Sequence, residues 1–235
     1  MKRYAFLIAI LCGMVAATSA QETQKLASLE EFSTKLSQQE NPQIIDARSA
    51  EEFALNHLPR AVNFNLQSTN YAALVKILDP AKPVFVYSIQ NGRSSALAGD
   101  LRSRGFREVY DLEKGLGNWV GGGKPLFVAG KEELSLSEFK QILASNKLVL
   151  VDIGSRYCGS CKRVKPILKT LRQELGEALK IVELGLEESP ELIASLKTVN
   201  AFPYLILYQQ GEIVWQRSGI TDLKSDLDLA LKKVK

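Results

Sequence analysis

The sequence predicts two α/β domains in tandem, each with a sheet between two layers of helices. Apolar runs of strand length alternate with amphipathic helical stretches twice along the 235 residues. Between the two halves lies Gly121-Gly122-Gly123-Lys124-Pro125, which neither a helix nor a strand accommodates. We therefore expect one domain over residues 21–128 and another over residues 129–235, after a leader over residues 1–20.

The leader has the pattern of a secretory signal peptide. Lys2 and Arg3 supply positive charge, the apolar run 5–11 follows, and small residues precede Gln21 as cleavage requires. This run is too short to predict a lasting membrane helix. We therefore expect an exported protein that is periplasmic or secreted.

Cys12 leaves an alternative open, because a lipoprotein could be anchored through it. The bulky Leu11 directly before it argues against this reading. If Cys12 leaves with the leader, the mature chain keeps only Cys158 and Cys161. The formal net charge of +4 gives no reason to expect a nucleic-acid partner. Membrane contact is expected only through a lipid on Cys12 or through a redox partner.

The first half begins with a helix led by Ser28-Leu29-Glu30-Glu31-Phe32, followed by the strand Gln43-Ile44-Ile45-Asp46. A second apolar strand, residues 83–87, leads into a loop over residues 88–93 and a helix that starts near Ser94. Backbone N–H groups of such a loop converge on one point and can hold an anion. This loop is the candidate binding site of the first half.

The second half begins with a helix led by Ser137-Glu138-Phe139. The strand Lys147 to Ile153 follows and is apolar enough for a position covered on both faces. A short turn then carries the chain to Cys158 and to another predicted helix. Later, residues 204–208 and 213–215 form a predicted hairpin.

Cys158-Gly159-Ser160-Cys161 is the motif that points most directly to a chemistry. Two thiols at this spacing can exchange a disulfide with another molecule. At the first turn of a helix, Cys158 would meet free N–H groups and the positive end of the helix dipole, which stabilise a thiolate. Nearby positive charge comes from Arg156, Lys162, Arg163 and Lys165. We expect Cys158 to attack and the more shielded Cys161 to resolve the mixed disulfide.

Asp152 lies near the end of the apolar strand, six residues before Cys158. A carboxyl group buried there would have a raised pKa and could take the proton of Cys161 as it attacks. The alternative is an ordinary exposed carboxylate at a strand end.

Together with Phe202-Pro203, the hairpin and Gly219, the dithiol motif resembles the thioredoxin family over residues 130–235. The resemblance implies a mixed sheet and thiol–disulfide exchange with protein cysteines, without a bound cofactor. It implies that Pro203 is cis and faces the dithiol, where the Phe202 backbone pairs with an extended substrate segment. It also implies a kink at Pro166.

Three features depart from the typical thioredoxin pattern. Gly159-Ser160 replaces Gly-Pro, the bulky Phe202 precedes the proline, and Gly154-Ser155-Arg156-Tyr157 replaces a tryptophan-bearing approach. These positions surround the reactive sulfurs. The redox potential and the choice of substrate therefore do not follow from the resemblance.

The first half resembles the rhodanese family over residues 25–127. The resemblance is carried by three short motifs and a later stretch: Asp46-Ala47-Arg48, Glu52-Phe53, His57-Leu58-Pro59-Arg60-Ala61-Val62, and Gly115 through Trp119. It implies a parallel sheet and a reactive loop over residues 88–93. Rhodaneses carry a cysteine where this chain has Ser88, and a serine hydroxyl is scarcely ionised at neutral pH. We therefore expect a catalytically inactive domain whose loop, with Ser88, Gly92 and Arg93, is an accessory binding site.

Several single residues have simpler structural interpretations. Arg93 could pair with a local carboxylate instead of an anion. His57 is more typical of a residue that holds a turn through hydrogen bonds, and Asp46 with Arg48 of a structural ion pair. No metal site is expected, because His57 is the only histidine and lies far from the dithiol in sequence.

The leading hypothesis is an exported thiol–disulfide oxidoreductase that acts on protein thiols and disulfides with an unidentified redox partner. One alternative is a scaffold that binds an anion or a partner, with Cys158–Cys161 as a structural disulfide. A second alternative is a sulfur-trafficking protein that carries a persulfide on Cys158.

Overall fold

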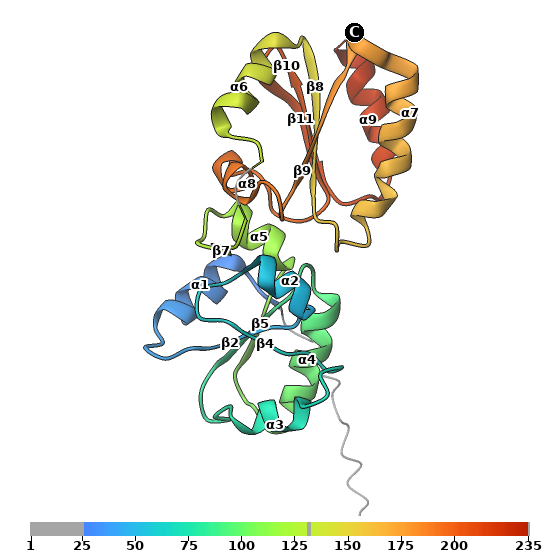
Figure 1. The fold of residues 1–235 in the computed structure, drawn as a ribbon. Helices are drawn as coiled ribbons and strands as arrows, with labels where there is room; N and C mark the ends of the chain where they lie inside the picture. The colour runs from blue at the N-terminus through green and yellow to red at the C-terminus, as the bar shows by residue number, and fades with distance from the viewer. Residues whose placement is uncertain (1–25, 131–132, 235) are drawn as a thin grey trace, which may run out of the picture.

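The computed structural model describes residues 26–130 and 133–234, which form two α/β units stacked end to end (Figure 1). The expected signal peptide and Cys12 lie outside the described residues. In these described ranges, no helix is long and apolar enough to cross a membrane.

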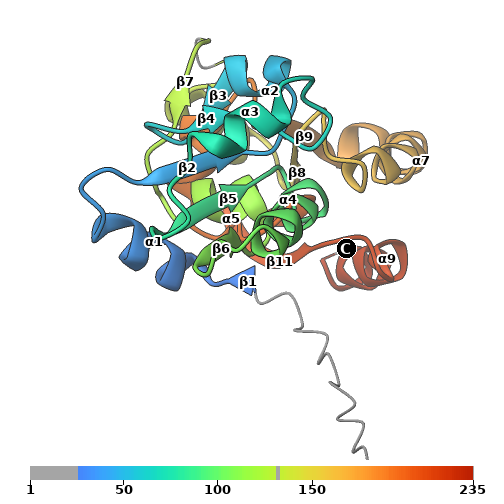
Figure 2. The ribbon, with the colours of Figure 1, turned by 90° about the horizontal axis from the view of Figure 1, so that it is seen from below.

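The first unit contains a five-stranded sheet in which every pair of neighbouring strands is parallel (Figure 2). Its order is β1 (Leu26–Ala27), β6 (Val109–Leu112), β5 (Val84–Tyr87), β2 (Gln43–Asp46) and β4 (Val62–Asn63). The strands predicted at residues 43–46 and 83–87 are confirmed. All of β5 is buried, as expected for a central parallel strand covered on both faces.

Helices cover both faces of this sheet. They are α1 (Leu29–Ser37), α2 (Ala50–Leu55), α3 (Tyr71–Lys76), α4 (Gly92–Ser103) and α5 (Gly115–Gly121). Apolar residues of α1 and α5 pack on one face, and those of α3 and α4 on the other. The α/β fold class with a parallel sheet is therefore confirmed. Gly121 ends α5, so the irregular link between the units begins one residue later than predicted, at Gly122.

A small antiparallel pair joins β3 (Asn56–His57) to β7 (Phe127–Val128), so the chain stays with the first unit as far as residue 128. His57 lies in this pair. Its Nδ1 is 2.9 Å from the Phe53 carbonyl oxygen, and its ring stacks on Phe53 at 3.9 Å between centroids. These contacts give His57 the structural role that the sequence indicated.

Asp46 and Arg48 form an ion pair in the interior of the first unit. Their side chains are 0% and 1% exposed, and Arg48 Nη2 lies 2.7 Å from Asp46 Oδ2. The Arg48 guanidinium also donates to the side-chain and main-chain oxygens of Asn56. The pair therefore ties the end of β2 to β3, as the structural interpretation predicted.

The second unit contains a mixed sheet, as predicted, and this sheet has four strands. Its order is β11 (Glu212–Ser218), β10 (Tyr204–Gln209), β8 (Leu148–Gly154) and β9 (Lys180–Gly185). Strands β10 and β11 form the predicted antiparallel hairpin, and β8 lies between β10 and β9. The central place of β8 explains its apolar sequence.

Helices also cover both faces of the second sheet. They are α6 (Leu136–Ser145), the 3₁₀ turn η1 (Cys161–Arg163), α7 (Lys165–Leu175), the 3₁₀ turn η2 (Gly176–Ala178), α8 (Pro190–Leu196) and α9 (Leu223–Lys233). Helices α7 and α9 pack on one face, and α6 and α8 on the other. This arrangement confirms the α/β class for the second unit.

The two units share one continuous apolar core, which runs from Phe32 and Trp119 to Phe202 and Ile153. Helix α5 lies at the junction and packs against α8 (Figure 1). Gly117 and Gly121 face the segment 199–202, and a Cβ atom at Gly117 would lie only 3.1 Å from backbone atoms of Ala201 and Phe202. Glycine thus allows α5 to approach that backbone closely.

We expect Asp46→Asn to lower the free energy of unfolding by about 3 kcal/mol, because the Arg48 charge would stay buried without its carboxylate. Urea unfolding followed by circular dichroism measures this. Asp228→Asn is the matched control, since it removes a pair with Lys224 whose side chains are 38% and 41% exposed. A loss no larger than that of the control would contradict the role of the buried pair.

Candidate functional site

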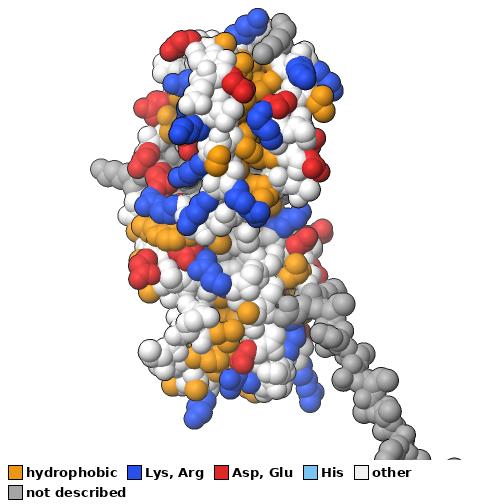
Figure 3. Space-filling view, turned by 90° about the vertical axis from the view of Figure 1, so that its right-hand side faces the viewer, with side chains coloured by type: hydrophobic (Ala, Val, Ile, Leu, Met, Phe, Trp, Pro, Cys, Tyr) orange, Lys and Arg blue, Asp and Glu red, His pale blue; other side chains and the backbone are white. Residues whose placement is uncertain are grey.

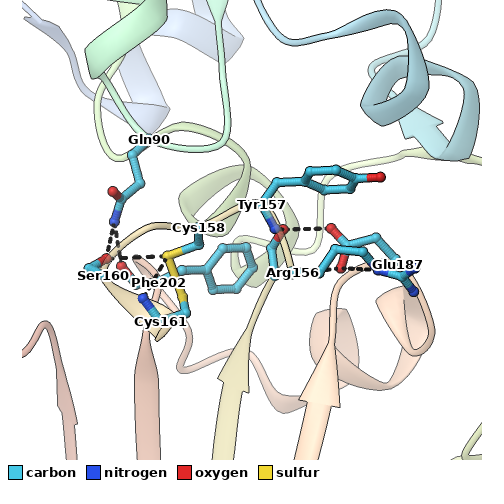
Figure 4. The surroundings of a disulfide bond; sticks show 9 residues. Gln90, Arg156, Tyr157, Cys158, Ser160, Cys161, Glu187 and Phe202 are labelled. Carbon is cyan, nitrogen blue, oxygen red and sulfur yellow. Dashed lines mark hydrogen bonds and ion pairs between the residues drawn. A yellow bond between two sulfur atoms is a disulfide. The ribbon is translucent and has the colours of Figure 1, made fainter. Parts of the chain in front are cut away.

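The dithiol lies in the turn that follows β8, at the end of the second sheet nearest the first unit (Figure 1). Cys158 and Cys161 form a disulfide with their Cα atoms 5.3 Å apart. The Cys161 N–H donates to Cys158 Sγ at 3.2 Å, and Ser160 Oγ lies 3.2 Å from the same sulfur (Figure 4). The Cys161 N–H and the Ser160 hydroxyl are thus placed to stabilise negative charge on the Cys158 sulfur.

The α-helix begins later than predicted. Cys161 opens the 3₁₀ turn η1, α7 starts only at Lys165, and Cys158 lies in the turn before both. Pro166 explains the break, because it has no N–H to bond the carbonyl of Lys162. Cys158 therefore does not occupy the first turn of an α-helix. Its sulfur meets the Cys161 N–H directly instead.

The prediction that Cys161 is the more shielded sulfur is wrong. Cys158 is 0% exposed and Cys161 is 8% exposed. The first unit lies over this end of the second sheet and places Gln90 beside the dithiol turn (Figure 4). Sequence patterns within one domain carry no information about such a contact.

The Phe202-Pro203 peptide bond is cis, as the resemblance implies, and the Phe202 side chain lies beside the disulfide (Figure 4). The Phe202 side chain is 1% exposed. The Phe202 carbonyl accepts a hydrogen bond of 2.6 Å from Gln90 Nε2, which also donates to Ser160 Oγ at 3.1 Å. Gln90 belongs to the loop predicted over residues 88–93, but no local pattern indicated a role for it.

Asp152 lies within β8, next to Leu205 of β10 and Glu183 of β9. Burial, followed by repulsion from Glu183, raises the pKa of Asp152 to about 7. Its Oδ1 is buried without a hydrogen-bond partner. The side chain of Asp152 is thus half-buried with one carboxyl oxygen shielded from water, and its pKa is raised as expected.

Gly154 connects Asp152 to the dithiol. A Cβ atom built at Gly154 would lie 3.0 Å from Cys161 Sγ, so this sulfur lies over the face to which a side chain at 154 would point. Side chains two residues apart on a strand point to the same face. The Asp152 carboxyl group and the Cys161 sulfur therefore share one side of β8.

Of the positively charged side chains near the dithiol, one pairs with carboxylates and three are exposed on η1 and α7. Arg156 pairs with Glu187 and Glu188. The side chains of Lys162, Arg163 and Lys165 on η1 and the start of α7 are exposed. In Figure 3, Lys and Arg side chains gather across the middle of the visible face, where the two units meet. The exposed cations therefore supply most of the positive field that the sequence predicted.

The polar side chains of Ser88 and Arg93 in the accessory loop form hydrogen bonds within the first unit. Ser88 is 1% exposed, and its hydroxyl donates to the Gln90 carbonyl and accepts from the Ser94 N–H. Arg93 forms two hydrogen bonds with the Glu52 carboxylate, at 2.5 and 2.8 Å. The local ion pair of Arg93 is thus present, and it neutralises the charge that was expected to attract an anion. Gly92, the first residue of α4, is exposed.

No group of three or more His, Cys, Asp and Glu side chains could hold a metal ion within residues 26–130 and 133–234.

Comparison with known proteins matches residues 130–232 to the family described as Thioredoxin and residues 28–121 to the Rhodanese-like domain. A thioredoxin of Listeria monocytogenes is 36% identical over 102 residues, which are 43% of this chain and 96% of that protein. A bifunctional thioredoxin reductase/thioredoxin of Mycobacterium leprae is 36% identical over 83 residues, which are 35% of this chain and 18% of that protein.

Among solved structures, oxidised mitochondrial thioredoxin 3 from Saccharomyces cerevisiae aligns with a TM-score of 0.38 and 24% identity. The alignment covers 42% of this chain and 89% of that one. The Listeria protein is matched over nearly its whole length, and the match to the Thioredoxin family over residues 130–232 includes Cys158 and Cys161. The chain is therefore a thiol–disulfide oxidoreductase that belongs to the thioredoxin family through its second half, preceded by a rhodanese-like domain.

Proposed function

We propose that the protein is exported and exchanges disulfides with protein cysteines through Cys158 and Cys161. The observation that carries the exchange chemistry is the Cys158–Cys161 disulfide, which lies beside Phe202 (Figure 4). A cysteine pair joined to each other, with hydrogen-bond donors aimed at one sulfur, suits an electron carrier.

In the reducing direction, the Cys158 thiolate attacks one sulfur of a substrate disulfide. The substrate's other sulfur leaves as a thiolate, and a mixed disulfide joins the two proteins. Cys161 then attacks the Cys158 sulfur, which releases the second substrate sulfur as a thiolate and closes the Cys158–Cys161 disulfide. Two electrons pass from the dithiol to the substrate, and the reverse sequence oxidises a substrate dithiol.

Asp152 is the proposed acceptor of the Cys161 proton. It shares one side of β8 with the Cys161 sulfur, and a pKa of about 7 lets it take a proton at neutral pH and give it up again. Positions 152 and 154 of the strand are separated by about 6.6 Å, and the Cys161 sulfur lies over position 154. The proposed route of the proton is therefore through one water molecule.

A redox partner must restore the dithiol after each reduction or the disulfide after each oxidation. The relative from Mycobacterium leprae is named for both a thioredoxin reductase and a thioredoxin. By analogy, we propose that this chain exchanges electrons with a separate protein, which sets the direction of the reaction.

The rhodanese-like domain is proposed to be a non-catalytic accessory. Sulfur transfer requires a thiolate that can hold a persulfide, and Ser88 carries a hydroxyl group instead. The Ser88 hydroxyl is committed to hydrogen bonds within its own loop. The domain therefore acts through its contact with the dithiol turn and not through a sulfur of its own.

Export is proposed from the leader, whose charged and apolar segments suit a signal peptide cleaved before Gln21. Compartments outside the cytoplasm allow stable disulfides and also need exchange enzymes. An exported oxidoreductase fits both conditions.

We expect Cys158→Ser to abolish reduction of insulin disulfides, because serine provides no thiolate. Cys161→Ser should instead accumulate a mixed disulfide with the substrate, since the resolving thiol is missing. Insulin turbidity and non-reducing gels measure these outcomes. Ser88→Ala is the control and should keep wild-type activity. Activity that survives Cys158→Ser would disprove the assignment.

We expect Asp152→Asn to slow resolution of the mixed disulfide about a hundredfold at pH 8, the usual scale of lost acid–base assistance. In the wild type, the carboxyl group becomes protonated below its pKa of about 7, so the difference should narrow as the pH falls to about 6. Stopped-flow measurement of mixed-disulfide decay tests this. An equal deficit at both pH values would rule out proton transfer by Asp152.

The same carboxyl group predicts a pH-dependent stability. Its pKa is raised in the folded state, so the folded chain binds more protons than the unfolded chain between pH 3.8 and about 7. Stability from this group is therefore complete below pH 3.8, falls as the pH rises toward 7, and stays lost above pH 7. Urea unfolding measures the free energy of unfolding of Asp152→Asn and of the wild type at pH 5 and at pH 8. The advantage of the variant over the wild type should be larger at pH 8. An advantage that does not grow with pH would contradict the buried charge.

Export predicts a mature chain that begins at Gln21. Expression in a bacterium, fractionation and intact mass measurement should recover this species outside the cytoplasm. Replacing Lys2 and Arg3 by glutamate should retain the chain in the cytoplasm, because the positive segment is lost. A wild-type chain found only in the cytoplasm with its leader intact would contradict export.

A further inference from the structure

Gln90 connects the rhodanese-like domain to the dithiol site. It belongs to the loop between β5 and α4, yet its side-chain amide donates to two atoms of the second unit (Figure 4). The acceptors are the Phe202 carbonyl oxygen at 2.6 Å and Ser160 Oγ at 3.1 Å. The two N–H groups of one amide are thus available to both sides of the reactive turn.

Both acceptors lie next to the reacting sulfur. Ser160 Oγ is 3.2 Å from Cys158 Sγ, and the Phe202 carbonyl directly precedes the cis proline. Cys158 itself is 0% exposed. The Gln90 side chain therefore lies where an incoming disulfide must pass to meet Cys158.

Disulfide exchange demands access, because the attacking sulfur approaches along the axis of the bond that it breaks. A protein substrate presents its disulfide on a main chain whose N–H groups need acceptors once they leave water. The Phe202 carbonyl and Ser160 hydroxyl are acceptors of that kind, and Gln90 already occupies them. A substrate must replace Gln90 there before the sulfurs can meet.

The rest of the interface is less easily displaced. Gly117 and Gly121 hold α5 close against the segment 199–202, and an apolar core runs through both units. Parting these surfaces would expose buried apolar area to water. The hydrogen bonds of Gln90 are between neutral groups and can be exchanged for water or peptide bonds at small net cost. Movement of the Gln90 side chain is thus the easier route to Cys158.

We propose that Gln90 limits access to Cys158 in this oxidoreductase. Its amide must leave the Phe202 carbonyl and Ser160 before a disulfide reaches the sulfur, so it slows small and protein disulfides alike. This inference rests on the proposed function, because it assumes that proteins are substrates.

The test compares two disulfides with the reduced full-length protein. Insulin offers main-chain N–H donors, whereas dithiobis(nitrobenzoate) is a small disulfide without them. Gln90→Met keeps the side-chain length and removes both donors. Gln67→Met, at an exposed glutamine of the same domain, is the matched control. Rates are divided by the thiolate fraction, which ultraviolet absorbance measures, so that a change in thiolate content is not mistaken for a change in access.

We expect Gln90→Met to react about tenfold faster with dithiobis(nitrobenzoate), which corresponds to about 1.4 kcal/mol and matches the loss of one or two neutral hydrogen bonds. Insulin reduction should accelerate by a similar factor, because insulin must displace the same amide in the wild type. An unchanged rate with the small disulfide overturns the proposal, and so does an acceleration confined to one of the two substrates. Failure of the proposed function looks different: the wild type would then react with the small disulfide and leave insulin intact.

Discussion

The close contact between α5 and the segment before Pro203 is the constraint on which the rest of the site depends. Gly117 and Gly121 remove the side chains that would hold the two backbones apart, and the apolar core then runs through both units. This contact fixes the rhodanese-like loop over the dithiol. The burial of Cys158 and the reach of Gln90 to Phe202 both follow from it.

The arrangement gives the rhodanese-like domain a physical role without sulfur chemistry. In its loop, Ser88 bonds to the Gln90 carbonyl and Arg93 bonds to Glu52. What the loop offers outward is the Gln90 amide. A fold associated with one reaction can in this way shape access to the reactive group of its neighbour.

Local sequence signals predicted most of the fold. The strands of residues 43–46 and 83–87, the strand before the dithiol and the later hairpin each show an apolar pattern that burial explains. The raised pKa of Asp152 was also predictable, because a lone carboxylate in an apolar strand must lose water. Such features depend on neighbours close in sequence or within one sheet.

The missed features depend on contacts that no local pattern records. Gln90 and Ser160 are 70 positions apart and meet only because the units pack, so neither the role of Gln90 nor the burial of Cys158 could be foreseen. The delayed start of α7 is different, because Pro166 was visible and its missing N–H was a sufficient signal.

The redox role of Cys158 and Cys161 is the central claim, and the reduction potential of this pair tests it most directly. Equilibration with glutathione or dithiothreitol buffers should give a value between about −270 and −120 mV, the range of exchange proteins. A value below about −300 mV, typical of structural disulfides, would contradict the account.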